Sequence, residues 1–194
     1  MQLTPLLFGY MTRSDCSPTS AAPRKPSHVL LLHWLSAGMI LIAFVLAWTH
    51  EAIDEKSIEI LVMNVHRQAG LLALMLLVPR VIARHLASEP SLAPTWHEKL
   101  AIVSHIALYG LLLAMPILGW AMTNAQGHEV SLFQLLQLPN LIGANPEAAD
   151  DLQDWHALLA KCLLGLISLH FSAALWHHFI RRDGVLASMW PMPK

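Results

Sequence analysis

Four long apolar segments constrain this chain more than any other feature of its 194-residue sequence. They run from about Val29 to Trp48, Ile60 to Ile82, Leu100 to Met122 and Trp155 to Ile180. A helix needs about 20 apolar residues to cross the hydrocarbon of a bilayer. Only helices and closed barrels satisfy their backbone groups there. The sequence therefore predicts an all-α fold, an integral membrane four-helix bundle.

The composition agrees with lipid as the solvent. Hydrophobic residues make up 55% of the chain and charged residues 13%, whereas a soluble domain carries roughly 25% charged residues. Mean hydropathy is +0.49. No basic face is left once the four segments are assigned, which argues against nucleic acid as a partner. Membrane lipid is the expected surrounding.

The chain divides into two parts. Residues 1–27 are rich in Pro, Ser and Thr and read as a flexible N-terminal tail. The apolar run Leu6 to Tyr10 precedes the basic residues of the tail instead of following them, so it is a poor signal peptide, and Met11 is a second candidate start. Residues 28–191 form the predicted four-span membrane domain.

The charges predict the orientation of the bundle. One set of connections and ends holds nine basic residues: Arg13, Arg24, Lys25, Arg80, Arg84, Lys99, Arg181, Arg182 and Lys194. The opposite connections are acidic and hold only Lys56. Cytoplasmic loops carry an excess of Lys and Arg, so both termini are expected to be cytoplasmic and the chain multi-pass. The apolar stretch Phe133 to Pro146 is expected to lie on the outer membrane surface.

Histidines inside the spans are the second unusual feature. His33 lies near the cytoplasmic end of the first span, and His66 lies near the outer end of the second. The fourth span carries His156 at its outer end and His170 fourteen residues later. Fourteen residues come within roughly 40° of four full helical turns and rise about 21 Å. These two histidines therefore share one stripe at two depths.

Matched depths pair the four histidines into an outer pair, His66 with His156, and an inner pair, His33 with His170. Two neutral imidazoles are suitable axial ligands for an electron-transferring haem iron. Neither cysteine, Cys16 or Cys162, belongs to the motif that attaches c-type haem. Hydrogen-bonded packing histidines are the structural alternative. A metal transporter is a weaker one, since transporter ligands gather at one depth with carboxylates or thiolates.

With these residues in place, the chain resembles the prokaryotic cytochrome b561 family. The pieces of the resemblance follow the family's order and are His33-Trp34-Leu35, His66 to Gly70, His105 to Tyr109, Pro116 to Trp120, Trp155-His156, Leu169-His170, Ala173 to His178, Arg181 to Leu186 and Met189 to Pro191. The departures are a longer tail and Trp190, where the family often has Leu. Neither departure touches a candidate ligand.

The resemblance implies a b-type cytochrome with two haem b groups in the bacterial inner membrane, and its four axial ligands carry over onto His33, His66, His156 and His170. It implies electron transfer between an outer-face donor and ubiquinone or menaquinone. Some members act as superoxide:quinone oxidoreductases, so superoxide is one candidate donor. The alternative is a membrane subunit that relays electrons for a peripheral dehydrogenase or hydrogenase. No catalytic residue is assigned.

Five further residues are candidate contacts to the haem carboxylates or to a quinone. His105 and Tyr109 lie one turn apart in the third span, and His177 follows the His170 stripe to the cytoplasmic boundary. Arg67 and Lys161 are expected near the outer haem, where they would neutralise propionates or attract an anion such as superoxide.

Overall fold

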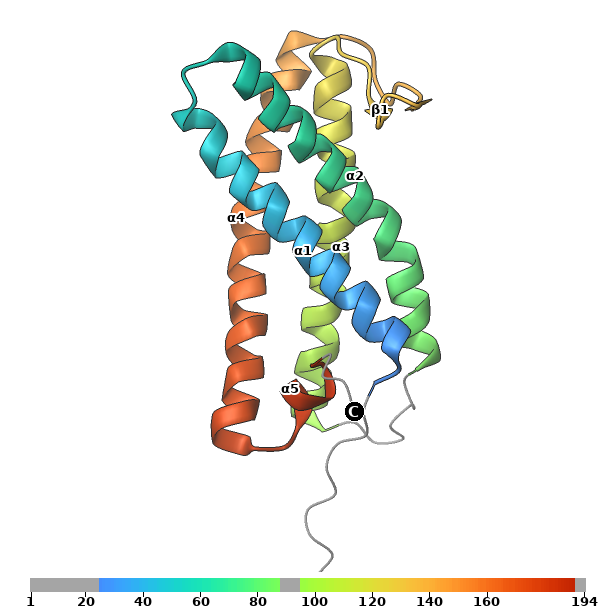
Figure 1. Cartoon of the computed structure of the whole chain (residues 1–194), viewed down its shortest axis with the longest axis vertical. Coiled ribbons are helices and arrows are strands. Elements are labelled where there is room, and N and C mark those ends of the chain that lie inside the picture. The colour runs from blue at the N-terminus through green and yellow to red at the C-terminus, as the bar shows by residue number, and fades with distance from the viewer. Residues whose placement is uncertain (1–24, 88–94, 191–194) are drawn as a thin grey trace, which may run out of the picture.

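The computed structural model of the chain describes residues 25–87 and 95–190. Four long helices dominate it: α1 (Ser27–Thr49), α2 (Lys56–Leu86), α3 (Trp96–Ala125) and α4 (Pro146–Trp176) (Figure 1). All four are long and apolar enough to cross a membrane. The predicted all-α, four-span architecture is confirmed. Residues 1–24 of the expected tail lie outside the described residues.

Two helices begin well before the apolar segments that predicted them, because their first turns are capped. Thr95 Oγ1 accepts a hydrogen bond from the Glu98 amide, and the Glu98 carboxylate accepts one from the Thr95 amide, which forms a capping box on α3. The Asn145 side chain accepts from the Ala148 amide, and Pro146 occupies the first turn of α4. The polar first turns therefore extend beyond the predicted spans.

A small hairpin lies in the long connection between α3 and α4 and was not predicted. Its strands are β1 (Ser131–Leu132) and β2 (Leu136–Gln137), which pair antiparallel. Gln68 on α2 holds it: its side-chain amide donates to the Ser131 carbonyl (2.8 Å) and accepts from the Phe133 amide (3.0 Å). The turn residue Leu135 is 90% exposed. The predicted contact of this stretch with the membrane surface stays a prediction.

Three helix pairs pack closely: α1 with α2, α3 with α4 and, over a shorter length, α2 with α3. The buried core lies near the middle of the bundle, where Leu77, Leu108, Leu112 and Leu163 come together from α2, α3 and α4. Among the described helices, α1–α4 and α2–α4 are not closely packed pairs. Helix α4 is thus held mainly by α3.

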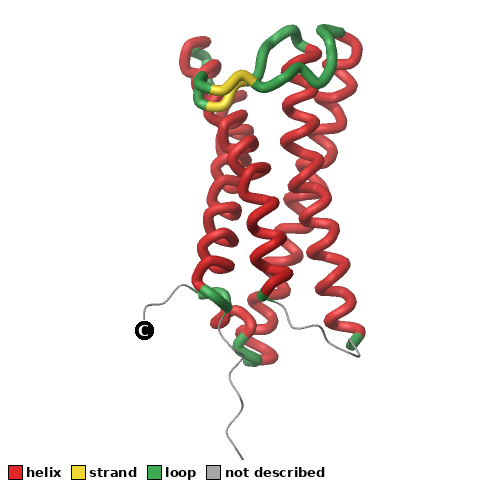
Figure 2. The backbone as a smooth tube through the Cα atoms, turned by 90° about the vertical axis from the view of Figure 1, so that its right-hand side faces the viewer, coloured by secondary structure: helices red, strands yellow, loops and turns green. Residues whose placement is uncertain are grey.

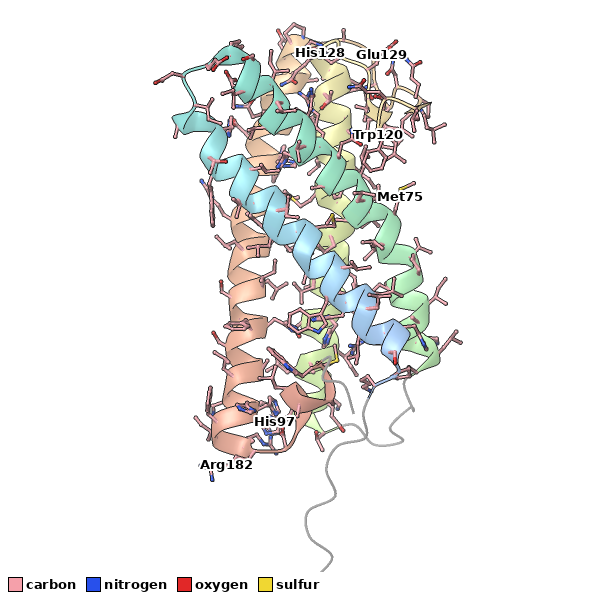
Figure 3. All side chains as sticks on the ribbon, viewed as in Figure 1. Met75, His97, Trp120, His128, Glu129 and Arg182 are labelled. Atoms are coloured by element: carbon pink, nitrogen blue, oxygen red, sulfur yellow. The ribbon has the colours of Figure 1, made fainter. Side chains whose placement is uncertain are left out.

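Large apolar side chains cover the outside of the helices, among them Leu41, Leu61, Val78 and Ile106, each more than 60% exposed. Soluble monomers rarely show apolar patches of this extent, whereas hydrocarbon solvates them. His128 and Glu129 mark one end of the bundle, and Arg182 and His97 mark the other (Figure 3). The acidic connections and the basic ends therefore lie at opposite ends of the molecule.

The chain after α4 turns back under the bundle. A π-helical turn, η2 (His177–Arg181), ends at Arg182, which has a left-handed backbone (φ 52°). Gly184 is also left-handed (φ 76°), and the short helix α5 (Val185–Ser188) follows. The last described residue, Trp190, lies against Trp34 near the start of α1, with ring centroids 6.0 Å apart. Figure 2 shows the four helices from the side, with the hairpin at the opposite end.

Asp183, outside the spans, makes the returning segment sensitive to acid. Burial alone would raise the pKa of its carboxyl, but the hydrogen bonds from His177 and the Val185 amide and the nearby charge of Arg181 lower that pKa overall. A carboxyl whose pKa is lowered by folding contributes stability above its unfolded pKa and loses it as the pH falls through the folded value.

We therefore expect amide-exchange protection factors in α5 to stay constant from neutral pH down to about pH 5, and to fall only well below about pH 4, the ordinary range of aspartate. Hydrogen exchange followed by mass spectrometry, corrected for the intrinsic rate at each pH, measures this. A loss of protection already near pH 6 would contradict it.

Candidate functional site

The structure brings together two of the candidate haem ligands, His66 and His156. The rings of His66 on α2 and His156 on α4 have centroids 6.3 Å apart with an interplanar angle of 70°. Both residues are partly buried, and they come from two helices that do not pack closely against each other. Two imidazole rings from different helices therefore lie close together in an edge-on arrangement.

This separation fits a single metal ion between the two rings. An imidazole nitrogen lies about 2 Å from a bound first-row metal and the ring centroid about 1 Å behind it, so two trans ligands have centroids roughly 6 Å apart. His66 and His156 would be the residues that hold a haem iron here. The donor set of two neutral imidazoles is the one b-type haem takes. The residues present therefore fit this group.

The hydrogen bond of His66 also leaves one of its ring nitrogens free to bind a metal. His66 Nδ1 donates a hydrogen bond to the Ala43 carbonyl of α1 (2.8 Å), which leaves the lone pair on Nε2. Metal-bound histidines usually donate their second N–H in this way. His156 Nδ1 is buried. Behind the His156 ring lies Gly119 of α3, at which an added Cβ would come within 3.3 Å of Cε1.

At the opposite end of the bundle the structure gathers three histidines. His170 of α4 contacts His105 of α3 with ring centroids 5.4 Å apart, and His105 in turn lies beside Tyr109 (6.4 Å). His105 Nδ1 donates to the Ala101 carbonyl of its own helix. His33 of α1 is within electrostatic range of both His170 and His105. All the predicted inner residues except His177 therefore belong to one cluster.

Arg80 of α2 joins this cluster and was considered in the sequence only as a loop charge. Its Nη2 donates to His33 Nδ1 (3.0 Å), and its guanidinium lies 5.7 Å from the Tyr109 ring centre. Since arginine can only donate, the His33 ring carries its proton on Nε2 in this arrangement. Metal binding through His33 Nε2 requires Arg80 to turn away, toward an anionic group.

The position of Arg80 was detectable in the sequence. It lies fourteen residues after His66, the same spacing that separates His156 from His170. The two helices therefore each present one outer and one inner polar side chain on a single stripe.

Three sequence candidates remain, Arg67, Lys161 and His177, of which Arg67 directly follows His66 on α2. Arg67 Nη1 donates to Asn64 Oδ1 one turn earlier on α2 (3.1 Å). Lys161 is exposed on α4. His177 Nδ1 lies 2.5 Å from Asp183 Oδ2, so its ring is held by the returning C-terminal segment.

Within residues 25–87 and 95–190, no group of three or more His, Cys, Asp or Glu side chains could hold a metal ion. The candidate ligand histidines thus lie in two separate clusters, one at each end of the bundle. Fold and histidines together define a helical membrane protein of the cytochrome type.

Comparison with known proteins agrees with this class. The family model described as prokaryotic cytochrome b561 matches residues 24–192. The chain is 31% identical to cytochrome b561 homolog 1 of Escherichia coli K12 over 169 residues, which cover 85% of this chain and 96% of the relative. It is 30% identical to the probable superoxide oxidase CybB of Yersinia pestis, over 82% of this chain and 92% of the relative.

The chain belongs to the prokaryotic cytochrome b561 family. It is therefore a bacterial membrane electron-transfer protein that binds b-type haem.

The close approach of Gly119 to His156 gives a test of the outer pair. In Gly119→Ala, the new methyl group would push the His156 ring aside, although alanine itself favours the helix by about 1 kcal/mol. We expect roughly tenfold weaker haem retention, the lower end of what disturbing a ligand's support causes, measured as the haem-to-protein ratio of purified protein.

Gly110→Ala on the same helix is the matched control, because an added Cβ there meets nothing within 4 Å. Equal haem content in the two variants would show that the His156 ring is not held by this contact.

Proposed function

We propose that the protein holds two haem b groups and carries electrons from a donor at its acidic face to a membrane quinone. One haem would lie between His66 and His156, and the other between His33 and His170. The 6.3 Å separation of the His66 and His156 rings is the observation that carries the proposal. When bound, each haem would supply a one-electron iron couple.

Helix packing favours His33 over His105 as the second inner ligand. A haem held between two helices would need them to pack less closely than a directly packed pair. Helices α1 and α4, like α2 and α4, are not among the closely packed pairs, whereas α3 and α4 are. The 5.4 Å contact of His105 with His170 is also shorter than two ligands on one iron require.

The residues around the two histidine clusters differ from those between them. The leucine core formed by Leu77, Leu108, Leu112 and Leu163 separates the histidine clusters and excludes water between them. Arg80 at the inner cluster and Arg67 near the outer pair are two cations that would neutralise haem carboxylates, which arginine can bind in bidentate fashion. His105 and Tyr109 remain the proposed quinone or propionate contacts.

Superoxide is the donor we propose, since one relative is named a probable superoxide oxidase. Two superoxide anions would each give up one electron and leave as dioxygen. One quinone would take both electrons and two protons to become a quinol. Arg67, Lys56 and Lys161 would attract the anion to an otherwise acidic face. In this proposal, the acidic face lies outside the bacterial inner membrane and both termini are cytoplasmic, as the distribution of Lys and Arg indicates.

The ligand assignment makes separate predictions for the two sites. His33→Ala and His170→Ala are each expected to lose the inner haem and keep the outer one, which lowers the haem-to-protein ratio by about half; His66→Ala and His156→Ala should do the reverse, since each removes one of two axial bonds. His105→Ala should keep both haems. Pyridine haemochrome spectra and redox titrations measure the outcome.

His128→Ala, in the exposed connection at the outer end, is the control for the loss of a histidine as such. Retention of both haems in His170→Ala, or loss of one in His105→Ala, would contradict the assignment.

Stopped-flow mixing with superoxide tests the donor. The haem bands should become reduced within the mixing experiment, and ubiquinone should reoxidise them. If superoxide leaves the haems oxidised while a co-purifying dehydrogenase or hydrogenase reduces them, the chain is a relay subunit.

A further inference from the structure

The segment after α4, residues 177–190, runs from the end of α4 to a contact with α1; we name it the strap. It leaves α4 through the π-helical turn His177–Arg181, reverses at Arg182 and Gly184, and continues as α5. Figure 1 shows α5 between the lower ends of α4 and α1. Both reversing residues have positive φ, so the change of direction is built into the backbone.

Asp183 fastens the first end of the strap. One carboxylate oxygen, Oδ2, lies 2.5 Å from His177 Nδ1 and 3.7 Å from Arg181 Nε. The other, Oδ1, accepts a hydrogen bond from the Val185 amide at the start of α5 (3.3 Å). A single side chain therefore links the end of α4 to the start of α5.

Trp34 fastens the second end. Its indole Nε1 donates to the Met189 carbonyl (2.8 Å), and its ring lies edge-on to Trp190 with centroids 6.0 Å apart. Ser188 beside them is buried. Because Trp34 belongs to the second turn of α1, the last residues of the strap are bonded to the first span.

The strap joins two helices that otherwise do not pack closely. Helices α1 and α4 are not among the closely packed pairs of the described chain, yet they carry His33 and His170. Trp34 also touches the inner site directly, since its ring meets that of His33 edge-on at 5.4 Å. The order of contacts runs from α4 through Asp183, α5 and Trp34 to His33.

We propose that the strap sets the separation between the inner ends of α1 and α4 and thereby positions His33 relative to His170. Trp34 and Asp183 are positioning residues in this arrangement. The link to haem rests on the proposed function; the link between the two helices does not.

The helix separation is tested without haem. We place spin labels on Leu31→Cys of α1 and Ala173→Cys of α4, both exposed, after replacing Cys16 and Cys162 by Ser. Trp34→Phe removes the indole donor, and Asp183→Ala removes the carboxylate. Each is expected to broaden the distance distribution and move it to longer distances in pulsed electron resonance measurements on the protein in nanodiscs.

Matched controls separate the strap from general damage. Trp48→Phe changes an exposed tryptophan at the other end of α1, and Asp151→Ala changes an exposed aspartate at the outer end of α4. Neither should alter the distance. A second label pair at the outer half, on Val45→Cys and Leu158→Cys, should be unaffected by cutting the strap.

Haem content gives the second measurement. In Trp34→Phe or Asp183→Ala, the inner haem should bind about tenfold more weakly, in line with other residues that support a metal ligand, while the outer haem is retained. Because Asp183 and Trp34 belong to one chain of contacts, breaking either contact should disconnect the strap. The double variant should therefore bind the inner haem no more weakly than the more severe single variant.

The outcomes are distinguishable. An unchanged label distance in both single variants overturns the strap. Effects that add in the double variant also overturn it, because they show two independent local contacts. A longer label distance with both haems held as tightly as before overturns the positioning of His33. Failure of the ligand assignment itself is detected separately, by the haem content of His33→Ala.

Discussion

The rest of the architecture depends on how α4 is held. This helix continues without interruption from Pro146 to Trp176, packs closely on α3, and packs less closely on α1 and α2. Its two inward histidines, His156 and His170, thus face helices that do not press against it. In hydrocarbon, apolar side chains gain little by leaving the lipid, so close packing is the main reason for helices to touch. In the proposed function, a haem held by the matched histidines would add contacts between α4 and these less closely packed helices.

Much of this could be derived from the sequence because a bilayer reduces the number of available folds. The four spans, their order and the outer His66–His156 pair followed from segment length and from the fourteen-residue spacing on a regular helix. Their ends did not, since Thr95 and Asn145 cap turns that are too polar to count as membrane segments. The inner ligand assignment remains a prediction, and the structure adds Arg80 and the His105–His170 contact to it.

What the sequence could not show are contacts between distant segments that follow no period. The hairpin depends on two consecutive left-handed residues, Phe133 and Gln134, neither of which is glycine. It depends equally on Gln68, a single amide on another helix. The strap depends on a backbone carbonyl, that of Met189, which carries no sequence signal. In each case the local sequence does not favour the observed conformation. Hydrogen bonds between residues far apart in the chain stabilise it instead.

The inner end of the bundle contains a partly buried positive charge, that of Arg80. Arg80 lies within the bundle, bonded to His33 and stacked on Tyr109. A desolvated guanidinium is tolerated only where an acceptor or an anion compensates it, and a histidine nitrogen is a weak acceptor for that purpose. The cation is thus better matched to a carboxylate than to its present partner, which agrees with its proposed role beside a haem propionate.

The bond from Trp34 to the Met189 carbonyl spans 155 positions of the chain. During synthesis the first span enters the membrane long before the strap has left the ribosome. The bond between Trp34 and the strap can therefore form only after residues 177–190 have been made, whereas the outer pair needs no residue beyond α4. The residues of the proposed outer haem site are accordingly all made before the strap, on which the proposed positioning of His33 depends.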